Sequence, residues 1–67
     1  MAVAKTIEIT STSTVGFDDA IKQGIARASK TVDNVSSAWV KDQEVEVSAG
    51  AIVEYRVRLA LTFLLKD

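Results

Sequence analysis

The sequence predicts an α+β fold with the element order strand, helix, strand, strand. Three observations support this prediction: an alternating first segment, one segment with helical spacing of its apolar residues, and two later alternating segments joined by a glycine-containing turn. All 67 residues are expected to form a single domain, residues 1–67, because a chain of this length is too short to build two hydrophobic cores.

The first element is predicted to be a strand from Val3 to about Ser11. Apolar and polar residues alternate along it, and Ile7 and Ile9 fall on the same side. A period of two with β-branched residues is typical of a strand that buries one face. The beginning of the chain alternates in this way and carries a carboxylate at Glu8, so we do not expect it to be a signal peptide.

The second element is predicted to be an amphipathic helix over roughly residues 17–31. Gly16 is a tolerable N-cap, and Asp18 and Asp19 fall in the first turn, where carboxylates favour the positive end of the helix dipole. Gly24 lies within the apolar stripe, which indicates a close approach between the helix and the surface that it covers. The stripe has i, i+3, i+4, i+7 spacing and consists of Phe17, Ala20, Ile21, Gly24, Ile25, Ala28 and Val32.

Residues 35–47 alternate, but they change phase partway along. Apolar residues fall at even numbers up to Val40 and at odd numbers from Val45 onward. A strand cannot change its buried face without an extra residue, so we expect a β-bulge near residues 41–43. Ser48-Ala49-Gly50 is predicted to be a three-residue hairpin loop.

The last strand is the longest and the most apolar, and this favours a central place in the sheet. With it between the other two strands, every neighbouring pair is antiparallel and the helix covers one face of a three-stranded sheet. The other face has no cover of its own. We therefore expect homo-oligomerisation, with copies of the chain packed over the apolar residues of that face, Trp39, Ile52, Ala60 and Leu64.

The composition excludes several classes of function. The chain has no His and no Cys, so it has no imidazole base, no catalytic triad, no thiolate nucleophile and no zinc–thiolate site. Eight basic residues against nine acidic ones do not favour nucleic acid as a partner. No apolar run approaches the roughly 20 residues that a membrane helix needs, so a cytoplasmic protein without a membrane partner is expected.

The carboxylates do not predict catalysis, and the chain is expected not to be an enzyme. Asp18 and Asp19 are interpreted as helix-capping residues rather than as metal ligands. The acidic set Asp42, Glu44 and Glu46 is interpreted as a solvated strand face. It would form a hard-cation site only if several copies brought their carboxylates together.

Trp39 and Arg56 form the most informative pair for function. With a bulge near residues 41–43, Trp39 falls on the sheet face away from the helix, where Arg56 and Arg58 also point. An aromatic plane beside guanidinium groups can hold a flat ring by stacking and an anionic tail by charge. In the alternative, Trp39 packs at a subunit interface and Arg56 pairs with Asp42 or Glu44 across the hairpin.

A set of residues spread along the whole chain forms a recognisable pattern together with its length and element order: Lys5-x-Ile7, Gly16-Phe17, Asp19-Ala20-Ile21, Ala26-Arg27-Ala28, the stretch Ala28-Ser29-Lys30-Thr31-Val32-Asp33-Asn34-Val35, and Glu54-Tyr55-Arg56-Val57. In these features the chain resembles the dodecins. The resemblance implies a β-α-β-β protomer and a hollow homododecamer of cubic symmetry, in which flavins stack in pairs near symmetry axes and are stored or sequestered rather than turned over.

The resemblance also implies where a flavin site would lie. The family's stacking Trp matches Ser37, the Gln that binds the flavin edge matches Arg56, and the acidic residue near the flavin side chain matches Asp42. Trp39 lies on the same strand face as Ser37, about 7 Å further along, so a displaced stack of FMN or riboflavin on Trp39 is one hypothesis. The other is a flavin-free shell whose altered positions make subunit contacts or bind a cation such as calcium, as the resemblance implies for some members without the stacking Trp.

Overall fold

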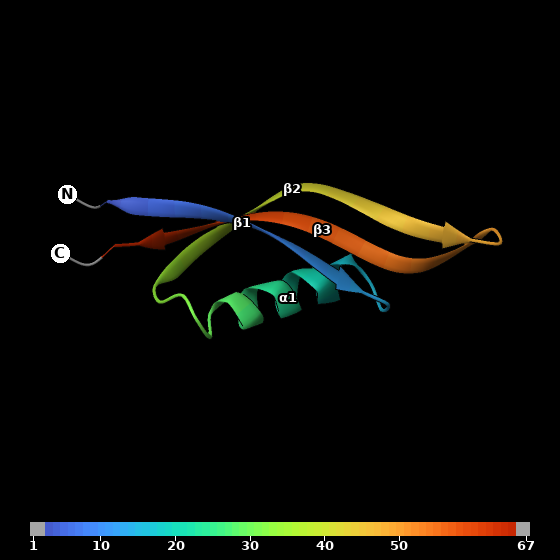
Figure 1. The fold of residues 1–67 in the computed structure, drawn as a ribbon, viewed down its shortest axis with the longest axis horizontal. Coiled ribbons are helices and arrows are strands. Elements are labelled where there is room, and N and C mark those ends of the chain that lie inside the picture. Colours follow the sequence, from blue (N-terminus) through green and yellow to red (C-terminus); the bar gives the residue numbers. More distant parts are fainter. Residues whose placement is uncertain (1–2, 66–67) are drawn as a thin grey trace.

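The computed structural model describes residues 3–65 and contains one helix packed on one sheet. The elements are β1 (Ala4–Ser13), α1 (Phe17–Ala28), β2 (Val35–Ser48) and β3 (Ala51–Leu64) (Figure 1). The sheet order is β1-β3-β2, and both pairs are antiparallel. The predicted β-α-β-β arrangement with the last strand in the centre is therefore confirmed. Within residues 3–65, no helix is long and apolar enough to cross a membrane.

The hydrophobic core lies between α1 and the central strand β3. Val57, Leu59 and Leu61 are fully buried on the side of β3 that faces the helix, together with Ala20 of the helix. Gly24 brings the helix close to the sheet, because a Cβ atom built at this position would lie 2.9 Å from the Cβ of Ser11. The close approach that the sequence predicted is thus observed. Partly buried apolar residues complete the core: Ile7, Ile9, Phe17, Ile21, Ile25 and Ala28.

Two element boundaries differ from the sequence-based prediction. β1 continues to Ser13 rather than ending near Ser11, because its pairing with β3 extends to Tyr55. The helix ends at Ala28 rather than near residue 31. The Ala28 carbonyl accepts bonds from the N–H groups of both Thr31 and Val32, so the chain closes in tight turns instead of a further regular helical turn.

The bulge in β2 is confirmed, and the hairpin loop is shorter than predicted. The register with β3 shifts between Val40 and Asp42, which leaves Lys41 as the extra residue. The loop has two residues, Ala49 and Gly50, rather than three. Both have positive φ angles, 50° and 79°, and this backbone matches the right-handed twist of the flanking strands.

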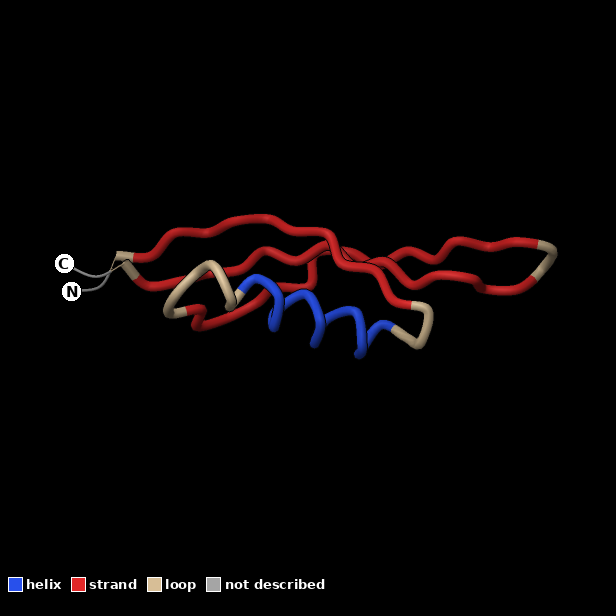
Figure 2. Tube along the Cα trace, turned by 60° about the horizontal axis from the view of Figure 1, so that its bottom comes forward, coloured by secondary structure: helices blue, strands red, loops and turns tan. Residues whose placement is uncertain are grey.

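The β2–β3 hairpin extends past the N-terminal end of the helix, so its tip has no cover from α1 (Figure 2). The molecule is accordingly elongated, measuring 52 × 19 × 13 Å. Apolar side chains stay at least half exposed on the uncovered hairpin: Val47, Ile52 and Val53. On the face away from the helix, Ile52 and Leu64 are exposed as expected, whereas Ala60 is buried.

Candidate functional site on the open sheet face

The sheet face opposite the helix, here called the open face, carries all four residues singled out from the sequence. Val57 and Leu59 point into the core. Because side chains alternate along a strand, Arg56 and the other even-numbered residues of β3 point to the opposite face. On β2, Ser37 pairs with Thr62, Trp39 with Ala60, and Asp42 with Arg58, all at even positions of β3. The bulge at Lys41 is what allows Trp39 and Asp42, three residues apart, to share this face.

Trp39 is the most prominent group on the open face, with 67% of its surface exposed. Ala60 of β3 separates it from Glu8 of β1 in one row across the three strands. The Lys41 ammonium lies 5.9 Å from the centroid of the Trp39 ring and 2.9 Å from Oε2 of Glu8. These four residues, here called the Trp39 cluster, combine an accessible aromatic ring with one ion pair.

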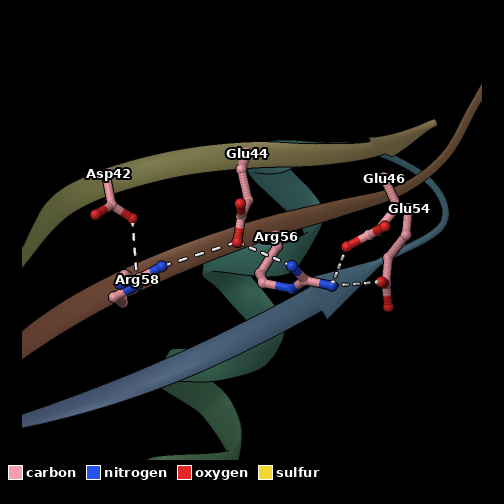
Figure 3. Close-up of polar contacts among 6 residues, drawn as sticks. All are labelled: Asp42, Glu44, Glu46, Glu54, Arg56 and Arg58. Carbon is pink, nitrogen blue, oxygen red and sulfur yellow. Dashed lines mark hydrogen bonds and ion pairs between the residues drawn. The ribbon is translucent and has the colours of Figure 1, made fainter.

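Arg56 belongs to a second group, the hairpin ion-pair network, which consists of Asp42, Glu44, Glu46, Glu54, Arg56 and Arg58 (Figure 3). Its guanidinium donates to Glu44 and Glu46 at 2.8 Å each and to Glu54 at 3.2 Å. Asp42 pairs instead with Arg58, at 3.4 Å. Of the two partners expected for Arg56 across the hairpin, the structure therefore selects Glu44.

Hydrogen bonds and charge within these groups shift the pKa of three side chains. The hydrogen bond from Arg56 lowers the pKa of Glu44, and those from Glu44 and Glu46 to Arg56 raise the pKa of the guanidinium. In the Trp39 cluster, the hydrogen bond from Lys41 lowers the pKa of Glu8. All three groups therefore stay charged near neutral pH, and they hold one another in place.

Within one chain, the structure does not bring Trp39 and Arg56 together. They lie four positions apart along β3, since Trp39 pairs with Ala60, and this is about 13 Å at the usual strand rise. A single ligand can contact both groups only if it spans this distance or if neighbouring copies contribute side chains.

The two acidic groups considered from the sequence do not form a metal site within one chain. Across residues 3–65, no group of three or more Asp or Glu side chains is arranged to hold a metal ion. Asp18 and Asp19 lie in the first turn of α1, as predicted, and neither forms a side-chain capping bond. Asp19 accepts from the Ser13 hydroxyl at 2.6 Å, and the same Ser13 oxygen accepts the N–H of Val15, so Ser13 ties the loop before α1 to its first turn.

Glu8 and Lys41 were not predicted from the sequence to belong to the site. They are 33 residues apart, and their contact depends on two strand registers and on the bulge. The signal that could have found them is the position of Glu8 on the polar side of β1, opposite the small Ala60.

The fold and the open face define a class of protein: a small, thin α+β protomer whose uncovered sheet face presents an aromatic ring and ion pairs. The sequence matches the Dodecin family over residues 3–66, and the chain belongs to this family.

Relatives of known structure share the fold along their whole length. A dodecin variant from T. thermophilus is 31% identical with a TM-score of 0.93, and the alignment covers 100% of both chains. The dodecin from Streptomyces davaonensis is 30% identical with a TM-score of 0.93, over 98% of this chain and 97% of the other. Calcium dodecin from Mycobacterium tuberculosis is 30% identical over 98% of this chain and 93% of its own, and its crystal structure gives a TM-score of 0.82.

Proposed function

We propose that the protein is a non-catalytic flavin-binding protein that stores or sequesters riboflavin or FMN as a homododecamer. The observation that carries this proposal is the Trp39 ring, which is two-thirds exposed on the open face of a dodecin protomer. A large exposed aromatic ring offers a contact surface to a ligand or another chain, and its flat face suits stacking with an isoalloxazine ring.

In this proposal the pocket is a modified one, lined by Ser37, Trp39, Asp42 and Arg56. Ser37 has no ring, so Trp39 supplies the stacking surface from a position two residues along the same strand face. Asp42 and Arg56 contribute through the hairpin network. Because Arg56 lies about 13 Å from Trp39 at the usual strand rise, the flavin either spans both groups of one chain or contacts side chains from neighbouring copies.

The homododecamer is supported by the apolar surface that one chain leaves exposed. Ile52 and Leu64 on the open face are 50% and 44% exposed, and Val47 at the hairpin is 61% exposed. A single 67-residue domain buries a small core and gains stability when copies cover such a surface.

The first experiment is a titration of the purified protein with riboflavin and FMN. Trp39 is the only Trp of the chain, so its emission and the flavin emission report on the same contact. Quenching of the flavin emission is expected for the wild type and for W39F, which keeps a ring, and is expected to be lost in W39A. Quenching of the Trp emission can be followed in the wild type alone, because both variants lack a Trp. Unchanged flavin fluorescence at saturating protein would rule out the proposal.

Light scattering tests the assembly separately from the ligand. The expected mass is twelve times the 7.2 kDa of one chain. A monomer or dimer at micromolar concentration would refute the dodecamer, whatever the flavin titration shows.

A flavin-free shell that binds calcium is the second candidate. The observation that favours it is the hairpin network, where four carboxylates face two guanidiniums; in addition, one relative is named calcium dodecin. A calcium site here would combine carboxylates from several copies, since one chain holds no such group among residues 3–65. Calorimetry with calcium, with magnesium as the control, should show heat that E44Q/E46Q abolishes if this candidate is right.

A further inference from the structure

We propose that Glu8 sets the charge preference of the flavin site by holding Lys41, so that the site binds riboflavin at least as tightly as FMN. This inference rests on the proposed flavin function and concerns which flavin is preferred. From the sequence, two partners for Arg56 stayed open: an anionic tail of the ligand, which would favour FMN, and a carboxylate across the hairpin.

The Lys41 ammonium lies over the Trp39 ring, 5.9 Å from its centroid. An anionic group of a ligand stacked on Trp39 can pair with this ammonium only if the ammonium is free. In the structure it is already engaged, because Glu8 accepts its hydrogen bond at 2.9 Å. Glu8 comes from β1 at the other edge of the sheet, and Lys41 reaches it across the small Ala60 of the central strand.

The other two cations of the described open face are engaged as well. Arg56 has three carboxylate partners, and Arg58 lies 3.4 Å from Asp42 and 3.8 Å from Glu44. The Trp39 cluster and the hairpin network together hold an excess of negative charge: the cations are Lys41, Arg56 and Arg58, and the anions are Glu8, Asp42, Glu44, Glu46 and Glu54.

A phosphate therefore gains little on this surface. To bind Lys41 it must replace Glu8, which exchanges one exposed ion pair for another, and such pairs contribute little individually. The surplus carboxylates repel the phosphate over a distance that grows as salt is lowered. Riboflavin carries no phosphate, so its ring can stack on Trp39 while the Lys41–Glu8 pair stays intact.

The test compares Kd values for riboflavin and FMN in wild type, E8Q and a matched control, D18N, at low salt. D18N removes one carboxylate from the exposed start of α1, on the opposite side of the sheet. We expect wild type and D18N to bind riboflavin as tightly as FMN or more tightly. E8Q frees Lys41 and should tighten FMN about threefold, the range of one exposed ion pair, while riboflavin stays unchanged.

The double variant E8Q/K41M should lose the gain for FMN, which assigns the effect to Lys41. A wild type that prefers FMN by threefold or more would overturn the inference and leave the flavin function standing. So would an E8Q variant in which the two flavins shift equally or not at all. If neither flavin quenches fluorescence in the wild type, the proposed function itself fails, and this inference with it.

Discussion

Gly24 is the position where a single added methyl group should disturb the fold most clearly. A Cβ atom at this position would lie 2.9 Å from the Cβ of Ser11, 3.2 Å from its Oγ and 3.3 Å from Cδ1 of Leu59. Ser11 cannot easily move away, because it lies within β1 and its hydroxyl donates to the carbonyl of Ala20 at 2.7 Å. Gly24→Ala therefore forces the helix away from the sheet or breaks this hydrogen bond.

The expected loss of stability is the difference between two terms of opposite sign. Overpacking of a tight contact costs about 1–3 kcal/mol, and a helix gains up to about 1 kcal/mol when Ala replaces Gly. We expect G24A to lower the free energy of unfolding by about 1–2 kcal/mol, which lowers the melting temperature of a domain of this size by roughly 5–15 °C.

Circular dichroism during guanidinium and thermal unfolding measures this change, at one fixed protein concentration because assembly contributes to stability. G16A adds a methyl group without a clash, since nothing beyond the chain neighbours lies within 4 Å of a Cβ built at Gly16; its effect therefore reports only the cost of Ala at the N-cap. S11G removes the contacting Cβ, so the cost of G24A should shrink in the S11G background. A G24A variant as stable as the wild type would show that the helix does not depend on this contact.

Three further predictions follow from single contacts. Ala49→Gly should raise the free energy of unfolding by up to about 1 kcal/mol in denaturant titrations, because Ala49 has a φ of 50° that suits glycine; an unchanged midpoint would contradict this. Ser13→Ala should lower it by about 1–3 kcal/mol, since a buried hydroxyl bonded to Asp19 is lost, and a neutral result would argue against this bond. Arg56 lowers the pKa of Glu44 in the folded state. The Arg56–Glu44 pair therefore stabilises the fold at pH values above the ordinary glutamate pKa near 4.5, and this stabilisation is lost as the pH falls through the lowered pKa of Glu44. Melting temperatures from pH 7 to 3 should therefore fall less steeply in Arg56→Gln than in the wild type; parallel curves would exclude this coupling.

Much of the fold could be predicted because its signals are local. The helical stripe, the alternating strands and the change of phase before Val45 depend on residues close in sequence, and the structure bears out all of them. The errors fall at element ends. The two-residue turn at Ala49 and Gly50 and the short helix depend on backbone angles and tight hydrogen bonds that residue type alone does not specify.

The candidate site was predictable in part. The bulge prediction was enough to place Trp39 on the open face, and a charged strand pattern was enough to expect Arg56 to pair across the hairpin. The choice of Glu44, Glu46 and Glu54 as its partners was not predictable, because several carboxylates lie within reach of one long guanidinium.

By itself the sequence determined the α+β elements, the sides of β1 and β3 that face the core and the face on which Trp39 lies, since these follow from periods of 3.6 and 2.0 residues along the chain. Only the tertiary structure decided that Lys41 reaches Glu8 beside the Trp39 ring and that Arg56 is held by three carboxylates. These contacts join strands whose relative register is set by the packing of the whole sheet, and no local pattern records which side chains that register brings together.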